Sequence, residues 1–317
     1  MVKILANDGI HPDGLTLLEE AGYEVDLEKV AQEDLMKVLP AYDVIIVRSA
    51  TKVRKDLIDA CPNLKIIARG GVGLDNIDYE YAQSKGILVI NTPAASSSSV
   101  AELAFAHIFS LARFLNRSNR ELATGNFKKL KDEFSEGVQL RGKTLGIIGF
   151  GRIGQEVARI GLALGMNVKP VDLIVEEADI NIQLFNMDTV KLSVHMPTFS
   201  MEEVLTTSDY LTLHVPASNG ALIGREEMNR MKKGAFIINT SRGGIVDEEA
   251  LLEALDSGRI GGVGIDVFEN EPTPRPELLS HPRISVTPHI GASTVEAQSY
   301  IGLELADRIL AFFGDDK

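Results

Sequence analysis

One glycine-rich segment constrains the fold of this chain more than any other part of its sequence. The hexapeptide 149–154 follows a β-rich run at 144–148 directly and leads into a helical segment at 155–164. A strand, a G-x-G-x-x-G turn and a helix in this order are typical of the dinucleotide-binding unit of doubly wound α/β folds. The first glycine permits a tight turn, the second lets backbone N–H groups approach a pyrophosphate, and the third lets the helix pack on the strand. The sequence therefore predicts a Rossmann-type domain whose dinucleotide contacts include Gly149, Gly151, Arg152, Ile153 and Gly154.

An acidic residue follows the next predicted strand. Asp172 lies 18 residues beyond Gly154, where a carboxylate can accept hydrogen bonds from the adenosine ribose and repel a 2′-phosphate. The next residues, Leu173 and Ile174, supply no arginine for an extra phosphate. The pattern favours NAD over NADP as the cofactor, although a solvated aspartate at a strand end would have the same sequence.

Two series of alternating strands and helices predict two α/β domains with parallel sheets, because such alternation requires crossover helices. A length of 317 residues and a hydrophobic content of 44% are enough for two cores. The first series has expected strands at 3–6, 24–27, 43–48, 64–69 and 88–91, and the second at 144–148, 168–171, 210–215, 235–239, 261–266 and 284–287.

Two segments depart from this alternation. The apolar segment 99–115 predicts one long helix that opens with a capping box formed by Ser99 and Glu102. Between 180 and 196, apolar and polar residues alternate on both sides of 185–188, which predicts an added β-hairpin. The sequence assigns no function to this hairpin.

The charge balance disfavours several classes of partner. The formal net charge is −13, which argues against nucleic acid and anionic membranes. The single cysteine, Cys61, cannot form an internal disulfide or a thiolate metal cluster. The N-terminal apolar run is too short for a signal peptide. We expect a cytoplasmic protein without a bound metal.

Four motifs together resemble those of the D-isomer-specific 2-hydroxyacid dehydrogenases. They are the glycine hexapeptide and the segments 239–244 (Asn-Thr-Ser-Arg-Gly-Gly), 266–272 (Asp-Val-Phe-Glu-Asn-Glu-Pro) and 288–291 (Pro-His-Ile-Gly). The resemblance spans essentially the whole chain. It is strongest to the D-3-phosphoglycerate dehydrogenase branch at 48–53, 69–78, 91–93 and 289–294, in a short form without a regulatory domain.

The resemblance implies a discontinuous architecture. A flavodoxin-like substrate domain, made of 1–97 plus 291–317, would receive the NAD-binding Rossmann domain 98–290 as an insertion. The active site would lie in the interdomain cleft. Family members are commonly dimers through the dinucleotide domain, so a homodimer is expected.

The same resemblance assigns the catalytic roles. His289 would be the acid/base, Glu271 its partner, and Arg242 the anchor of the substrate carboxylate. These residue types suit the chemistry, because a carboxylate favours the protonated ring and an arginine can donate two parallel hydrogen bonds to a carboxylate. Taken singly, each could equally be a structural histidine, a loop carboxylate and a surface cation.

Further contacts are carried over from the family. Asp266 would contact the nicotinamide amide, and Asn76 would brace the glycine-rich loop 70–73, whose N–H groups would meet the substrate carboxylate. Additional cofactor contacts are expected at His214, Val215, Thr240, Ser241 and Gly291. The expected substrate-binding residues are Arg48, Arg69, Gly71, Val72, Gly73 and Asn76, with Lys128 or Lys129 as weaker candidates for a substrate phosphate. The remaining histidines, His11, His107, His195 and His281, are expected to be structural.

The expected activity is NAD-dependent oxidation of D-3-phosphoglycerate to 3-phosphohydroxypyruvate, the entry to serine biosynthesis. A broader D-2-hydroxyacid dehydrogenase, or a hydroxypyruvate/glyoxylate reductase, would keep the same catalytic residues without needing Arg48. An NADH-sensing binding protein is a more distant alternative.

Overall fold

The computed structural model describes residues 1–183 and 191–314. It divides into two compact units. Unit 1 comprises Met1–Ser97 and Ala292–Lys317, and unit 2 comprises Ser98–Gly291. The chain therefore leaves unit 1 after Ser97 and returns to it after Gly291, where the sequence suggests boundaries after residues 97 and 290.

Unit 1 is built on a five-stranded parallel sheet of order β2-β1-β3-β4-β5. Its central strand β3 reads Val-Ile-Ile-Val, and all four residues are buried, as a strand covered on both faces requires. The strand order reverses between β1 and β3, so this is the flavodoxin-like topology that the sequence predicts. The strands are β1 (Lys3–Ala6), β2 (Glu24–Asp26), β3 (Val44–Val47), β4 (Ile66–Arg69) and β5 (Leu88–Asn91).

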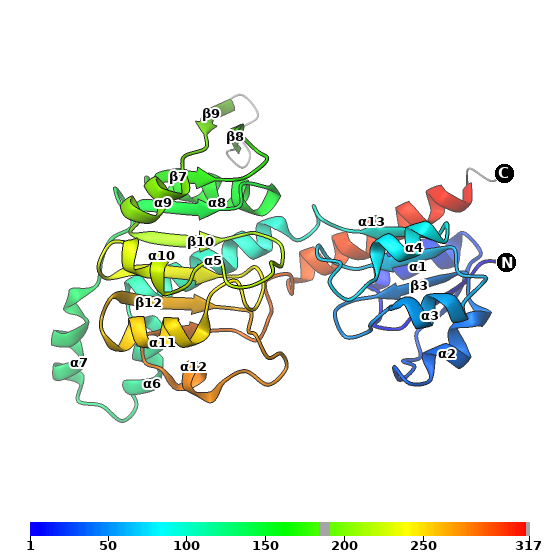
Figure 1. Cartoon of the computed structure of the whole chain (residues 1–317), viewed down its shortest axis with the longest axis horizontal. Helices are drawn as coiled ribbons and strands as arrows, with labels where there is room; N and C mark the ends of the chain where they lie inside the picture. The colour runs from blue at the N-terminus through cyan, green and yellow to red at the C-terminus, as the bar shows by residue number, and fades with distance from the viewer. Residues whose placement is uncertain (184–190, 315–317) are drawn as a thin grey trace. The chain divides into compact units, whose positions relative to one another are not determined.

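The last helix of the chain packs against the first. A Cβ placed on Gly14 of α1 would lie 2.2 Å from the carbonyl oxygen of Gly302 on α13, so the two helices touch at their backbones (Figure 1). This contact explains how a C-terminal segment belongs to the N-terminal unit. The helices of unit 1 are α1 (Pro12–Glu20), α2 (Leu35–Val38), α3 (Lys55–Ala60), α4 (Tyr79–Ser84) and α13 (Val295–Gly314), with a 3₁₀ turn at Leu39–Ala41.

Unit 2 holds a six-stranded parallel sheet of order β13-β12-β11-β10-β6-β7. The order reverses between β6 and β10, and the glycine hexapeptide follows β6. The strands are β6 (Thr144–Ile148), β7 (Asn167–Val171), β10 (Tyr210–Leu213), β11 (Ala235–Asn239), β12 (Ile260–Ile265) and β13 (Ile284–Val286). The helices are α5 (Ser97–Ala112), α6 (Leu115–Glu121), α7 (Phe127–Glu133), α8 (Arg152–Ala163), α9 (Met201–Thr207), α10 (Arg225–Arg230), α11 (Glu248–Asp256) and α12 (Pro276–Ser280), with a 3₁₀ turn at Phe134–Glu136.

The predicted hairpin is confirmed. Strands β8 (Glu177–Gln183) and β9 (Lys191–Pro197) pair antiparallel beside β7 and α8 (Figure 1). Ile180 and Met196 are buried in the same cluster as residues of α8, so one face of the hairpin joins the core of unit 2. The predicted turn at 185–188 lies outside the described residues.

The predicted long helix 99–115 is wrong at both ends. Helix α5 already begins at Ser97, so Ser99 lies inside the helix and not at its N-cap. It ends at Ala112, because Phe114 takes a left-handed φ of 56° and its ring stacks on Phe134 at 5.3 Å. The serines at 96–99 are equivalent starts by sequence, and the tertiary packing of α5 selects among them.

No single helix among the described residues is long and apolar enough to cross a membrane. Helices α5 and α6 reach that length and composition only as a pair, bent by 62° at the break between them.

Candidate active site

His289 and Glu271 lie together at the carboxyl edge of the unit 2 sheet. His289 follows β13, Glu271 lies in the loop after β12, and His289 Nδ1 is 2.8 Å from Glu271 Oε2. The other carboxylate oxygen, Oε1, accepts the Phe268 N–H at 3.0 Å, which orients the carboxylate. Both side chains are partly exposed, 45% for His289 and 36% for Glu271. Among the described residues none hydrogen-bonds His289 Nε2, so this nitrogen can meet a substrate.

Arg242 lies in the loop that follows the neighbouring strand β11. Asn239 at the strand end donates to the Arg242 carbonyl oxygen at 2.9 Å and accepts from the Ser241 hydroxyl at 2.7 Å. A Cβ on Gly243 would lie 1.9 Å from the Phe268 carbonyl oxygen. The absence of a side chain at Gly243 thus lets the Arg242 loop pack directly on the loop that carries Glu271.

Asp266 organises the loop around His289. It is 1% exposed. Its Oδ1 accepts from Thr287 Oγ1 at 2.6 Å and from the Ile290 N–H at 2.9 Å, and its Oδ2 accepts from the Gly291 N–H at 2.8 Å. Asp266 and Gly291 are therefore joined by a hydrogen bond, which the sequence does not indicate.

The glycine hexapeptide fits a dinucleotide at each of its three glycines. Gly149 has a φ of +95°, and a Cβ there would lie 2.6 Å from the His214 carbonyl oxygen. A Cβ on Gly151 would meet nothing within 4 Å, whereas one on Gly154 would lie 2.0 Å from the Gly149 carbonyl oxygen. Gly149 and Gly154 therefore allow close packing of the backbone, and the missing side chain of Gly151 leaves space for a pyrophosphate.

The start of α8 supplies the donors for an anion. Gly151 is the N-cap and provides no side-chain cap. Within the described ranges, no hydrogen bond occupies the N–H groups of Arg152, Ile153 or Gly154. These groups and the positive end of the helix dipole could hold a pyrophosphate.

Asp172 lies at the end of β7, beside the hexapeptide. Its Oδ2 accepts the Phe150 N–H at 2.6 Å, and its Oδ1 accepts from Ile174 and Val175 at 2.8 and 3.0 Å. Burial by itself raises the pKa of Asp172, but these backbone donors outweigh it and lower the pKa below the usual value. The Leu173 N–H is a further backbone donor to this carboxylate, so backbone groups occupy most of its roughly four lone-pair sites.

Two buried polar atoms lie unpartnered at the ends of β10 and β11. Within the part of the chain that the structure describes, His214 Nδ1 and Thr240 Oγ1 have no hydrogen-bond partner. His214 Nε2 is bonded to Thr212 Oγ1 at 2.9 Å, and burial lowers the pKa of His214 to about 3. A neutral, unsatisfied ring and hydroxyl on adjacent strands fit a site that a polar cofactor completes. Val215 lies beside Gly149, with Cγ1 3.1 Å from a Cβ placed there.

In unit 1, Arg48 lies at the point where the strand order reverses. The loop 48–51 follows β3, and Asp8 follows β1. Asp8 Oδ2 accepts the N–H groups of Arg48 and Thr51 at 2.7 and 3.0 Å. Asn76 Nδ2 donates to the carbonyl oxygens of the same two residues at 2.7 and 2.6 Å. Ligands of open α/β sheets bind at such a reversal, which favours this loop as a substrate contact.

These contacts correct the expected role of Asn76, which braces loop 48–51 rather than loop 70–73. Loop 70–73 is held by β5 and the residue after it. Asn91 donates to the Val72 carbonyl oxygen at 2.7 Å, and Thr92 Oγ1 accepts the Gly71 N–H at 2.9 Å. The Gly71 N–H is therefore already used, and only those of Val72 and Gly73 have no partner among the described residues.

Arg69 is turned back onto its own loop. Its Nη1 donates to the Gly70 carbonyl oxygen at 3.3 Å, and a Cβ on Gly71 would collide with the guanidinium. The Arg69 guanidinium, which the sequence expects to bind substrate, thus contacts the backbone of the glycine loop.

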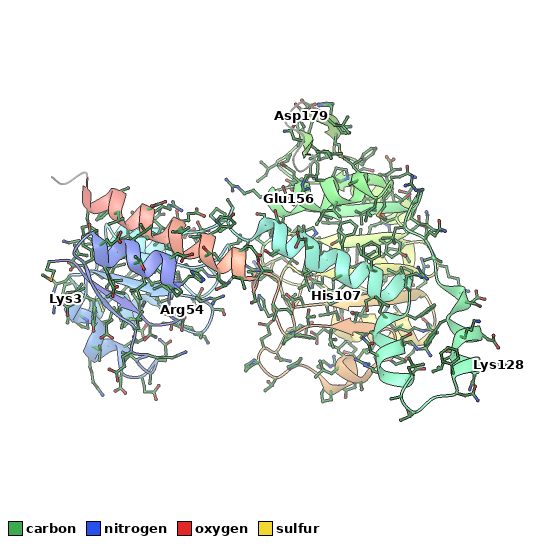
Figure 2. All side chains as sticks on the ribbon, turned by 180° about the vertical axis from the view of Figure 1, so that it is seen from behind. Lys3, Arg54, His107, Lys128, Glu156 and Asp179 are labelled. Carbon is green, nitrogen blue, oxygen red and sulfur yellow. The ribbon has the colours of Figure 1, made fainter. Side chains whose placement is uncertain are left out.

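Lys128 and Lys129 lie at the other edge of unit 2. Asn116 on α6 donates to the carbonyl oxygen of Ile284 at 3.0 Å, and Ile284 is the first residue of β13. Arg117 on α6 pairs with Glu133 on α7 at 2.6 Å. Helix α7, which carries Lys128 (Figure 2), is thereby held at the amino ends of the strands, opposite His289 and Arg242.

Sequence reasoning missed Glu248 and Asp8. Glu248 is 5% exposed, and its Oε1 accepts the Glu269 N–H at 2.9 Å beside the catalytic loop. Burial raises the pKa of this carboxyl group. Each carboxylate belongs to a different segment of the chain from the loop that it holds, so no local pattern identifies it.

The described residues contain no group of three or more His, Cys, Asp or Glu side chains arranged to hold a metal ion.

Comparison with known proteins identifies the family of the chain. Residues 105–291 match the family model described as D-isomer specific 2-hydroxyacid dehydrogenase, NAD binding domain. The chain is 43% identical to a hydroxypyruvate reductase of Thermotoga maritima, covering 98% of both chains. It is 41% identical to a D-3-phosphoglycerate dehydrogenase of Methanocaldococcus jannaschii, over 98% of this chain but only 57% of that relative's length. The crystal structure of the TT0316 protein from Thermus thermophilus superposes with a TM-score of 0.86 at 30% identity, covering 99% of this chain and 97% of that one.

A parallel sheet with an open glycine loop at its reversal point and a histidine–carboxylate pair at the same edge defines an NAD-binding oxidoreductase. The chain belongs to the D-isomer specific 2-hydroxyacid dehydrogenase family, and unit 2 is that family's NAD-binding domain. These matches confirm the family, the fold class and the cofactor that the motifs predict.

Proposed function

We propose that the chain interconverts a D-2-hydroxy acid and its 2-keto acid with His289 as the acid/base. The observation that carries this proposal is the 2.8 Å contact between His289 Nδ1 and Glu271 Oε2. Because Nδ1–H donates to the carboxylate, Nε2 of the neutral ring presents its lone pair to the substrate hydroxyl and takes the proton. In the reverse direction the imidazolium returns the proton to the carbonyl oxygen. NAD, when bound, supplies the hydride acceptor.

Arg242 serves the substrate carboxylate in this proposal. Its loop packs on the Glu271 loop through Gly243, so the cation and the acid/base pair are fixed on one edge of the sheet. A guanidinium keeps its charge and can donate two parallel hydrogen bonds to a carboxylate. The hydroxy acid is thereby oriented by its carboxylate while its hydroxyl meets His289.

As the substrate we propose D-3-phosphoglycerate, oxidised to 3-phosphohydroxypyruvate for serine biosynthesis. Arg48 supports it, because loop 48–51 is clamped by Asp8 and Asn76 at the reversal point of unit 1. The relative from Methanocaldococcus jannaschii that bears this activity in its name is 41% identical to the chain over the 57% of its length that the chain covers.

Reduction of hydroxypyruvate is the second candidate. The Thermotoga maritima relative with that name matches along its whole length. Arg69 is turned back under its loop, and Lys128 and Lys129 lie at the opposite edge of unit 2 from His289. Arg48 is then the main cation left for a phosphate among the residues expected to bind it.

The experiment is NADH oxidation with 3-phosphohydroxypyruvate, hydroxypyruvate, glyoxylate, pyruvate and 2-ketoglutarate, for the wild type and Arg48→Gln. A preference for the phosphorylated acid that Arg48→Gln reduces at least tenfold in kcat/KM is expected. The control is Arg54→Gln, because Arg54 pairs with Asp78 at 3.0 Å in the same unit. Equal use of hydroxypyruvate, unchanged by Arg48→Gln, would favour the second candidate. NADH binding without turnover of any acid would favour the sensor.

We also propose a cytoplasmic homodimer. Helices α5 to α7 and the segment after them expose apolar side chains at Phe109, Leu115, Leu122, Phe127 and Val138, which a second copy could cover. Light scattering should give twice the chain mass of 34.4 kDa, and a monomer at micromolar concentration would refute the dimer.

A further inference from the structure

His107 is a buried histidine with a partner on each ring nitrogen. It lies on α5, the long helix of unit 2 (Figure 2), and is 2% exposed. Its Nδ1 is 2.9 Å from Ser285 Oγ, and its Nε2 is 3.1 Å from Thr287 Oγ1. A Cβ on Gly264 of β12 would lie 2.5 Å from the His107 Cβ, so the helix approaches the sheet closely at this point.

The positions of the protons in this chain of contacts follow from Asp266. Thr287 Oγ1 is 2.6 Å from Asp266 Oδ1, and an ionised carboxylate only accepts. The single hydroxyl proton of Thr287 therefore goes to Asp266, and Thr287 must accept from His107 Nε2–H. Burial lowers the pKa of His107, so the ring is neutral. Nδ1 is then an acceptor, and the Ser285 hydroxyl at 2.9 Å is its donor, while Ser110 Oγ lies farther from Ser285 Oγ, at 3.4 Å.

This series of hydrogen bonds reaches the residues on both sides of His289. Asp266 accepts a hydrogen bond from the Thr287 hydroxyl, two residues before His289, and from the N–H groups of Ile290 and Gly291, the two residues after it. Asp266 thus closes a ring of hydrogen bonds around Pro288 and His289.

This ring holds His289 in an unfavourable backbone conformation. His289 has a φ of +56°, in the left-handed region that L-residues with a Cβ rarely adopt. Such a conformation persists where the surroundings over-determine it, and it clusters at functional sites. Here it directs Nδ1 to Glu271.

We propose that His107 and Thr287 are positioning residues for His289. They act through Asp266 to hold the His289 loop, with His107 fixed as the Nε2–H tautomer. The proposal rests on the proposed function only in giving His289 the acid/base role; the hydrogen-bond chain itself can be tested without turnover.

The kinetic test compares Thr287→Val, which removes the hydroxyl, with Thr287→Ser, which keeps it. A catalytic group displaced by about 1 Å can cost about 10²-fold. We expect kcat to fall tenfold to a hundredfold in Thr287→Val, with the Kd for NADH within twofold of wild type and the activity largely restored in Thr287→Ser. Equal kcat in the two variants, or a loss of NADH binding that parallels kcat, would overturn the positioning role.

A second pair of variants tests His107 in the same way. His107→Gln retains a hydrogen-bond donor toward Thr287, whereas His107→Phe supplies an aromatic ring without any donor or acceptor. We expect His107→Phe to lower kcat at least fivefold more than His107→Gln. Ser285→Ala is the matched control, since it removes the other partner of His107 and leaves Thr287 bonded to Asp266. A kcat loss in Ser285→Ala equal to that in His107→Phe would refute a path through Thr287.

Two measurements need no substrate. Nitrogen NMR of the wild type should show His107 as the Nε2–H tautomer at pH 7. Amide hydrogen exchange of Ile290 and Gly291 should accelerate at least tenfold in Thr287→Val and not in Thr287→Ser. An Nδ1–H tautomer, or unchanged exchange in Thr287→Val, would overturn the proposal even in an active enzyme. If the exchange rates and the tautomer agree with these expectations but the enzyme turns over no acid, the proposed function fails and the positioning proposal stands.

Discussion

His289 Nδ1 and Glu271 Oε2 lie 2.8 Å apart, although the residues are 18 positions apart in the chain. A second imidazole–carboxylate pair, His195 Nδ1 with Asp179 Oδ1 at 3.0 Å, lies on the exposed hairpin β8–β9. Similar contact geometry thus occurs away from the carboxyl edge of the sheet as well. Only the first adjoins an arginine loop and the carboxyl edge of the sheet.

The two histidine–carboxylate pairs allow a matched test of the assignment of His289 as the acid/base. His289→Gln should lower kcat/KM about 10²- to 10⁴-fold, the usual contribution of general acid–base catalysis, with NADH affinity retained. His195→Gln should leave kcat/KM within twofold. Steady-state kinetics with the best acid of the panel checks both. A small loss in His289→Gln would remove His289 from the acid/base role.

Two glycines of the hexapeptide should respond oppositely to alanine. A Cβ on Gly151 meets nothing within 4 Å, so Gly151→Ala should keep its melting temperature yet raise the Kd for NADH at least tenfold by filling the pyrophosphate space. A Cβ on Gly154 would lie 2.0 Å from the Gly149 carbonyl oxygen, so Gly154→Ala should cost about 1–3 kcal/mol of stability. Thermal melts and NADH fluorescence titration distinguish them. A destabilised Gly151→Ala with unchanged NADH affinity would contradict the assignment.

Asp172 should control the choice between NADH and NADPH. Its carboxylate, ionised at neutral pH because backbone donors lower its pKa, repels a 2′-phosphate. Asp172→Ser should therefore lower the preference for NADH over NADPH in kcat/KM at least tenfold. Asp172→Asn is the control for damage to the loop, because it removes the charge but retains one acceptor for the Phe150 N–H. The change in cofactor preference should therefore appear in Asp172→Asn as well. An unchanged cofactor preference in both variants would exclude Asp172 as the selector.

The free energy of unfolding should decrease as the pH is lowered, because of His214. Burial lowers its pKa from 6.5 to about 3, so the unfolded chain binds a proton that the folded chain does not. The contribution is complete above pH 6.5 and is lost as the pH falls toward 3, with a slope of about 1.4 kcal/mol per pH unit at most. Urea melts at pH 7, 6 and 5 should show a shallower decline in His214→Asn. Parallel declines in the two proteins would contradict the buried, neutral ring.

The parallel strands of both units are predictable to within one or two residues, because buried parallel strands have a strong local signature, whereas β8 begins at Glu177 and not at the predicted residue 180. Val44–Val47 and residues 235–238 are continuous apolar runs, and burial on both faces demands such runs. The start of α5 is not predictable, since Ser96 to Ser99 offer equal caps by sequence and the helix begins at Ser97.

The candidate site divides in a similar way. The glycine hexapeptide was predictable in detail because one short segment carries all three geometric requirements. Asn76 was assigned to the wrong loop, and Asp8 was missed, because the clamp on Arg48 and Thr51 joins segments about 25 to 43 residues apart. A contact between distant loops leaves no periodic pattern in the sequence.

Local spacing predicts the two α/β units and the position of the dinucleotide loop, and the resemblance to the family predicts the acid–base residues. The folded chain fixes the groups that hold His289 at its left-handed φ, the turn of Arg69 onto its own loop, and the place of Lys128 at the opposite edge of unit 2 (Figure 2). Local patterns do not contain these contacts, because hydrogen bonds to backbone groups, such as those of Asp266 and Asp8, depend on where the ends of parallel strands meet. That arrangement arises only when strand order and register are set by the folded sheet.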